Sequence, residues 1–137
     1  MSAENKALVQ RWFDQVWNEG RADAIDDMFA ADGVAHGLGQ DLHGPVEFKV
    51  FHATFRGAFP DVRVHMDEMI AEGDSVAYRF TATGTHRGSD LGFPATGRPV
   101  RFLGMGSVRI ANGKVVEGWN VLDQLGMLTQ LGVVAAP

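Results

Sequence analysis

Near its C-terminus the chain reads Gly113-Lys-Val-Val-Glu-Gly-Trp-Asn-Val-Leu-Asp123-Gln-Leu-Gly-Met-Leu-Thr-Gln-Leu-Gly132, which predicts a turn, a strand and a helix in succession. Asn112-Gly113 favours a type I′ hairpin turn, because both central residues of that turn need positive φ. Residues 115–121 then predict a strand. Leucines at 125, 128 and 131 follow at the spacing of one face of a helix.

Asp123 stands where the predicted strand ends and the predicted helix begins. An aspartate buried at such a junction needs a partner or a task, because burying its charge costs several kcal/mol unless it is paired. Two interpretations remain open. The carboxylate either caps the first turn of the helix, or it lines a cavity and exchanges a proton there near neutral pH.

Composition predicts one globular domain that spans residues 1–137 and is 45% hydrophobic and 21% charged. The net charge of −5 argues against a general attraction to nucleic acid or to anionic membranes. The chain has no cysteine, so it has neither a disulfide framework nor a thiol nucleophile. Without a signal-peptide pattern or a membrane-length apolar run, a cytoplasmic protein is expected.

The first 60 residues predict three helices, at 3–19, 23–31 and 45–59. In the first helix, Trp12 lies on an apolar stripe and Phe13 lies beside it. In the third helix, phenylalanines recur at three-to-four residue spacing and include Phe51 and Phe55. These aromatic residues are the candidates for the wall of a pocket.

From residue 62 onward the hydrophobic pattern has a period of two, which indicates strands at 62–70, 75–86, 99–110 and 115–121. Residues 87–97 are polar and rich in glycine, so they predict a loop. Residues 34–36 are a possible edge strand. Helices followed by an antiparallel meander predict an α+β fold, with the helices packed on one face of a glycine-bent sheet that forms a hollow cone.

Several motifs, taken together and in this order, resemble the SnoaL-like polyketide cyclase or ester cyclase branch of the nuclear transport factor 2-like superfamily. The motifs are Ala58-Phe-Pro-Asp61, Ala82-Thr-Gly-Thr-His-Arg-Gly88, Gly92-Phe-Pro-Ala-Thr-Gly97, Glu117-Gly-Trp119, Asp123-Gln-Leu-Gly126 and Gln130-Leu-Gly132. The resemblance covers nearly the whole chain, from about Asn5 to Gly132. It implies the nuclear transport factor 2-like cone as the fold.

The resemblance also implies a cofactor-independent, intramolecular aldol-type ring closure in a polyketide-like ester or carbonyl compound. Asp123 matches the single aspartate that acts as the general acid/base in such cyclases. Those enzymes also carry a histidine and a glutamine on the preceding strand, where this chain offers only Ser107 and Arg109 as polar candidates. The expected partner is a small hydrophobic molecule, and no cofactor is expected.

Three further residues are candidates for substrate binding, each with a structural alternative. Trp119 lies four residues before Asp123, so in an extended strand both side chains would share one face with Val121, opposite Asn120. His36 could reach the cavity from the sheet edge, and His86 closes the long strand at 75–86. The spacing of the five histidines matches no metal-binding motif, so no metal site is expected.

Alternative functions remain open at this stage. The chain could be a non-catalytic protein that binds a small hydrophobic molecule, an epoxide hydrolase-like enzyme, or an isomerase of the ketosteroid type. Epoxide hydrolysis is disfavoured because residues 99–111 contain no carboxylate. The ketosteroid isomerase mechanism needs a buried tyrosine, for which Tyr78 is the sole candidate. Because one sheet face would stay uncovered, a two-fold homodimer is expected.

Overall fold

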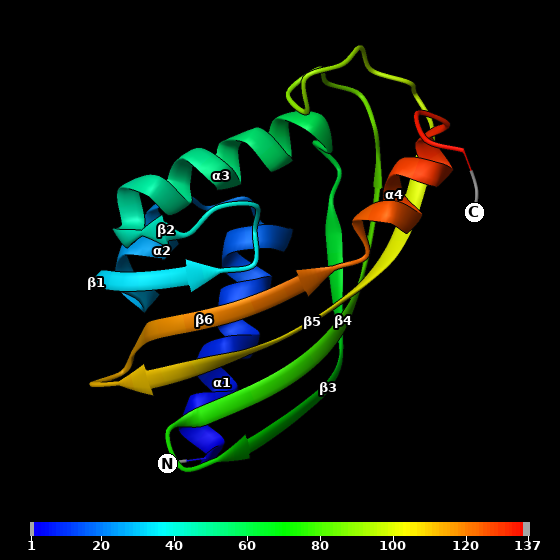
Figure 1. Ribbon diagram of the computed structural model, residues 1–137. Helices are drawn as coiled ribbons and strands as arrows, with labels where there is room; N and C mark the ends of the chain where they lie inside the picture. The colour runs from blue at the N-terminus through cyan, green and yellow to red at the C-terminus, as the bar shows by residue number, and fades with distance from the viewer. Residues whose placement is uncertain (1, 136–137) are drawn as a thin grey trace.

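The computed structural model describes residues 2–135 and consists of helices packed against one curved sheet (Figure 1). The helical segments are α1 (Ser2–Trp12), the π-helix η1 (Phe13–Asn18) that continues it, α2 (Asp23–Met28), α3 (Gly44–Ala58) and α4 (Gln124–Leu131). The strands are β1 (Phe29–His36), β2 (Leu42–His43), β3 (Arg63–Glu72), β4 (Ser75–Thr85), β5 (Pro99–Ala111) and β6 (Lys114–Leu122).

The sheet has six strands in the order β2-β1-β6-β5-β4-β3, and its pairs are antiparallel except for β1 with β6. The predicted α+β fold is therefore confirmed. The predicted type I′ turn is also present between β5 and β6, since Asn112 and Gly113 have φ of 53° and 74°. Within the described residues, no helix is long and apolar enough to cross a membrane.

Two predicted elements differ from the structure. The second helix was expected to extend to residue 31, but it ends at Met28, because Phe29 already has the extended backbone of β1. The segment 34–36 was considered a possible edge strand, whereas it is part of an interior strand between β2 and β6. The parallel contact with β6 could not be seen in a local pattern, since the two segments are about 80 residues apart and only the folded chain joins them.

Two glycines of β5 make room for aromatic rings on the concave side of the sheet. Gly104 pairs with Phe80, and Gly106 pairs with both Tyr78 on β4 and Asn120 on β6. A Cβ on Gly104 would lie 2.2 Å from the Phe80 ring, and one on Gly106 would lie 2.7 Å from the Tyr78 hydroxyl. The side chains of β4 therefore lie across the bare backbone of β5.

The Gly104→Ala substitution should destabilise the protein by about 1–3 kcal/mol, the usual cost of overpacking a core. Urea unfolding with an unchanged slope would measure this loss. Gly118→Ala is the matched control within the same sheet, because its Cβ would meet no atom closer than 3.3 Å. Equal losses in the two variants would contradict the assigned role of Gly104.

Candidate functional site

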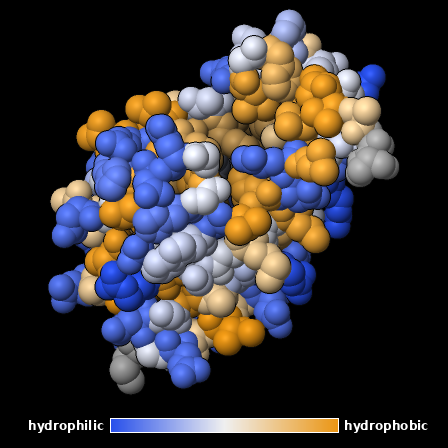
Figure 2. Space-filling view, viewed as in Figure 1, coloured by the Kyte–Doolittle hydropathy of each residue, from blue (hydrophilic) through white to orange (hydrophobic). Residues whose placement is uncertain are grey.

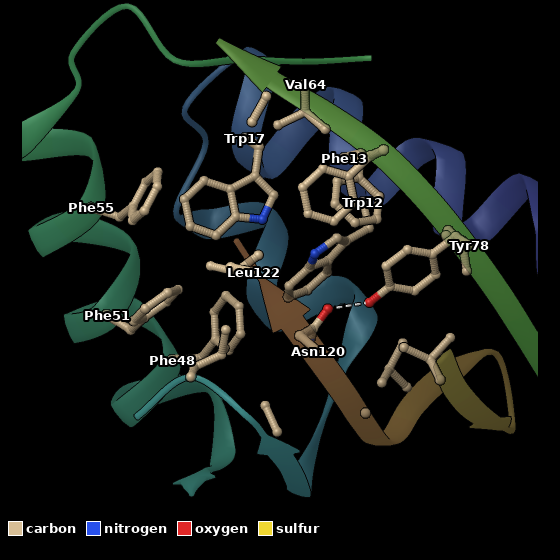
Figure 3. Close-up of a pocket in the computed structure, with 18 of the residues that line it drawn as sticks. Trp12, Phe13, Trp17, Phe48, Phe51, Phe55, Val64, Tyr78, Asn120 and Leu122 are labelled. Atoms are coloured by element: carbon tan, nitrogen blue, oxygen red, sulfur yellow. Dashed lines mark hydrogen bonds between the residues drawn. The ribbon is translucent and has the colours of Figure 1, made fainter. Parts of the chain in front are cut away.

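The concave side of the sheet and the helices enclose a cavity with mostly aromatic walls (Figure 3). Its aromatic lining comes from α1, η1, α3 and the strands: Trp12, Phe13, Trp17, Phe29, Phe48, Phe51, Phe55, Tyr78, Phe80 and Phe102. Several of these rings contact one another edge to face, such as Trp12 with Phe48 and Trp17 with Phe51, whose centroids are 5.1 and 6.0 Å apart. Such a cavity favours flat, apolar ligands.

Few polar groups face this cavity, and two of them, those of Tyr78 and Asn120, pair with each other. The Tyr78 hydroxyl donates a short hydrogen bond to Oδ1 of Asn120 (Figure 3). Burial raises the pKa of the Tyr78 phenol, so the group stays protonated and acts as a hydrogen-bond donor. No carboxylate lines this main cavity within residues 2–135.

Four of the predicted site residues line the cavity, namely Trp12, Phe13, Phe51 and Phe55. Trp119 does not, because successive side chains of a strand point to opposite faces. The inward positions of β6 are 118, 120 and 122, so Trp119 lies on the outer face, where its side chain is 44% exposed. The prediction that Trp119 forms a pocket wall is thus wrong.

Asp123 is the N-cap of α4, as the first of the two interpretations expected. Its Oδ1 accepts a hydrogen bond of 2.9 Å from the Gly126 N–H, and its side chain is exposed. It nevertheless borders a second hollow that shares Leu38, Phe51, Phe55, Phe102 and Leu122 with the main cavity. Figure 2 shows a hollow with hydrophobic walls between the α3 and α4 regions. Asp123 therefore stands at the cavity mouth rather than among the aromatic rings.

His36 belongs to a charged network on the outer face of the sheet and does not reach the cavity. Its Nε2 bonds to Glu117 at 2.7 Å and its Nδ1 to Asp41 at 2.9 Å. Arg109 contacts the other oxygen of Glu117 at 3.2 Å, and the Trp119 ring stacks on the imidazole. The pKa of His36 is raised, first by Glu117 and then by Asp41, while the pKa of Glu117 is lowered by His36 and Arg109.

His86 also lies away from the cavity, in the core between Phe59 and Phe93, whose ring centroids are 5.6 and 5.1 Å away. Its Nδ1 accepts a hydrogen bond of 3.0 Å from the Thr96 N–H, which anchors the loop after β4. The expectation of a pocket-facing His86 is therefore not met. Within residues 2–135, no group of His, Cys, Asp and Glu is arranged to hold a metal ion.

The polar residue that sequence reasoning missed is Asn120, since the strand pattern alone did not say which face of β6 points inward. Tyr78 was considered only for an isomerase mechanism. Ser107 and Arg109, the polar candidates on β5, alternate with the inward residues of that strand and face outward. The inward positions 104 and 106 are glycines, and Gly106, which pairs with Asn120, was the available signal for open space beside that residue.

We predict that Glu117→Gln lowers the pKa of His36 more than Asp41→Asn does, because Glu117 is the larger cause of its upward shift. The ion pair should stabilise the fold fully between pH 4.5 and 6.5, the ordinary values of the two groups. It is lost above this window as His36 deprotonates through its raised pKa, and below it as Glu117 is protonated. NMR titration of the imidazole measures both variants. A His36 pKa that is unchanged in Glu117→Gln would contradict the assignment.

Comparisons with known proteins agree with this architecture. Residues 7–131 match the family described as SnoaL-like polyketide cyclase. Two aklanonic acid methyl ester cyclases, DnrD of Streptomyces peucetius and DauD of Streptomyces sp. strain C5, are each 30% identical to this chain over 132 residues. Those alignments cover 91% of this chain and 88% and 80% of the two relatives.

Solved structures show the same fold. AclR of Streptomyces galilaeus, proposed to be a hydroxylase, has a TM-score of 0.88 at 29% identity, with 100% of this chain and 86% of that chain covered. A protein of Jannaschia sp. CCS1, proposed to be a SnoaL-like polyketide cyclase, has a TM-score of 0.88 at 26% identity, with 99% and 95% covered. The chain belongs to the SnoaL-like polyketide cyclase family and has its nuclear transport factor 2-like fold.

Proposed function

We propose that this protein binds a hydrophobic, polyketide-like carbonyl compound in its aromatic cavity and closes a ring in it by an intramolecular aldol reaction. The observation that carries the proposal is a cavity with aromatic walls whose polar groups are neutral, and whose mouth holds one carboxylate. Relatives that are 30% identical over most of this chain are cyclases of aklanonic acid methyl ester, so that ester is the first substrate to test.

In the proposed reaction, a base removes a proton from a carbon that lies between electron-withdrawing carbonyls and leaves an enolate. The enolate carbon attacks a ketone carbon of the same molecule, and the resulting alkoxide takes up a proton. Atoms balance without a co-reactant, so the protein mainly positions the two carbons and moves one proton. The Asn120 side-chain NH2, whose amide oxygen is held by the Tyr78 hydroxyl, is a neutral donor suited to stabilise the negative oxygen in water-poor surroundings.

Asp123 is the proposed acid/base because it is the carboxylate that borders the cavity mouth. Its Oδ1 holds the cap of α4, while Oδ2 receives no hydrogen bond from any residue between 2 and 135. One oxygen therefore anchors the side chain and the other is available to exchange a proton with a substrate that extends from the cavity. The cap also fixes the orientation of the carboxylate, which favours proton transfer to a bound ligand.

Asp123→Asn should lower ring-closing turnover about 10²- to 10⁴-fold, the usual contribution of general acid–base catalysis. Asparagine caps a helix as well as aspartate does, so stability and substrate binding should be kept. Conversion of aklanonic acid methyl ester, followed by liquid chromatography with mass detection, measures the effect. Asp32→Asn removes an equal charge from an exposed position on β1 and should leave turnover unchanged. Wild-type turnover in Asp123→Asn would exclude this residue as the acid/base.

A second candidate function is binding of a hydrophobic metabolite without chemistry. The specific observation that favours it is that Tyr78 is the sole ionisable residue of the main cavity within the described part of the chain, and burial keeps it protonated. Wild-type protein that binds the ester but never converts it would support this candidate over the cyclase.

A two-fold homodimer through the outer sheet face also forms part of the proposal. Leu103, Met105 and Val121 are 52%, 58% and 73% exposed on β5 and β6, beside Trp119. Met105 and Val121 are paired neighbours, so these side chains form one patch. Figure 2 shows hydrophobic side chains gathered over this part of the sheet. A contiguous apolar patch of this kind is typical of an interface between subunits.

Val121→Asp should shift the protein from dimer to monomer at micromolar concentration, because an interface would have to bury an unpaired charge. Size-exclusion chromatography with light scattering measures the mass. Val46→Asp is the control, since Val46 is similarly exposed at 76% but lies on α3. A wild-type protein that is already monomeric, or a Val121→Asp variant that stays dimeric, would refute this interface.

A further inference from the structure

Two indole N–H groups in the cavity, those of Trp12 and Trp17, have no hydrogen-bond acceptor among residues 2–135. In Figure 3 both nitrogens point toward the middle of the cavity. Two side-chain polar atoms of the described chain are fully buried without a hydrogen-bond partner, namely His86 Nε2 and Thr129 Oγ1. The two indole nitrogens are not among them, so each remains accessible. Both donors therefore border the open space of the cavity, and a ligand that fills this space would bury them and would have to supply their hydrogen-bond partner.

The π-helical turn explains why two residues five apart share this space. In an α-helix, positions five apart differ by about 140° around the axis, so the two rings would point to different sides. A π-helix bonds residue i to residue i+5, so each turn holds more residues and positions five apart lie closer together around the axis. Trp12 immediately precedes the π-helix Phe13–Asn18, and Trp17 lies within it. Single π-turns occur often at functional sites.

Helix α3 holds the backbone of this turn in place. His52 Nε2 donates a hydrogen bond of 2.7 Å to the Val16 carbonyl, and Arg56 donates one of 2.7 Å to the Trp17 carbonyl. The Trp17 ring also packs between Phe51, Phe55 and the His52 ring. The orientation of the indole N–H is thus set before a ligand arrives, which reduces the entropy cost of binding.

We propose that Trp12 and Trp17 form a receptor for a carbonyl oxygen, and that they make the cavity select flat aromatic ketones over hydrocarbons of the same shape. The inference deepens the proposed function, since it names the part of the substrate that the cavity recognises. A carbonyl oxygen carries two lone pairs and can accept from both indoles. A ligand without an acceptor leaves both donors buried and unpaired, which is the usual source of strong discrimination.

The test compares 9-fluorenone with fluorene, two flat tricyclic probes that differ by a carbonyl in place of a methylene group. Equilibrium dialysis gives the affinity of each probe for wild type, Trp12→Phe and Trp17→Phe. Wild type should prefer fluorenone, and each substitution should reduce the ratio of the two affinities about 2- to 13-fold, the range for one neutral hydrogen bond. Each substitution also removes apolar contact, which weakens the binding of both probes alike. This effect cancels in the ratio of the two affinities.

Two control variants sharpen the result. Phe80→Leu removes a cavity ring that has no N–H and that contacts the rings of Phe13 and Tyr78 but neither indole, so it should weaken both probes and leave the ratio unchanged. Trp119→Phe removes an indole from the outer face and should change neither affinity. The proposal is overturned if wild type binds neither probe, if it binds both equally, or if both cavity variants keep the wild-type ratio. Absence of ring-closing turnover would refute the proposed cyclase while leaving this selectivity in place.

Discussion

The alternation of side chains along β6 is the constraint on which the rest of the site depends. Gly118, Asn120 and Leu122 face the cavity, so Trp119 and Val121 must face outward. Because of this alternation, the amide of Asn120 faces the main cavity, whereas the carboxylate of Asp123 does not line it. The alternation also places an aromatic and an aliphatic side chain on the opposite, uncovered face of the sheet. The proposed ligand binding and the proposed self-association thus use opposite faces of the same strand.

The composition of the cavity follows from the same geometry. Its polar groups are the Tyr78–Asn120 pair and the two indole N–H groups, which are neutral and mainly donors. Such groups can stabilise an oxygen that gains negative charge without the cost of burying an ion. The glycines of β5 are what allow the pair to meet, because a side chain at Gly106 would occupy their place. Of the candidate site residues that can carry charge, Asp123 lies at the mouth and His36 lies in the outer network.

The local pattern was enough to predict the main helices, the four long strands and the turn at Asn112-Gly113, and it offered the cap at Asp123 as one of two interpretations. Each of these depends on residues within one turn or one strand, where periodicity and φ preference act directly. The aromatic candidates of the first and third helices were found for the same reason, since an amphipathic helix shows its buried face in its own spacing. The resemblance to the SnoaL-like family reduced the possible α+β folds to one, the nuclear transport factor 2-like cone.

What the sequence determined by itself is therefore a helix-covered, curved antiparallel sheet with aromatic residues turned toward it. Only the tertiary structure decided which face of β6 closes the cavity, that His36 bonds Glu117 instead of a ligand, and that His86 anchors a loop within the core. It also decided that a π-turn brings Trp12 and Trp17 into one space. Each of these depends on contacts between residues far apart in the chain or on a shift of one residue in register, and a local pattern contains neither.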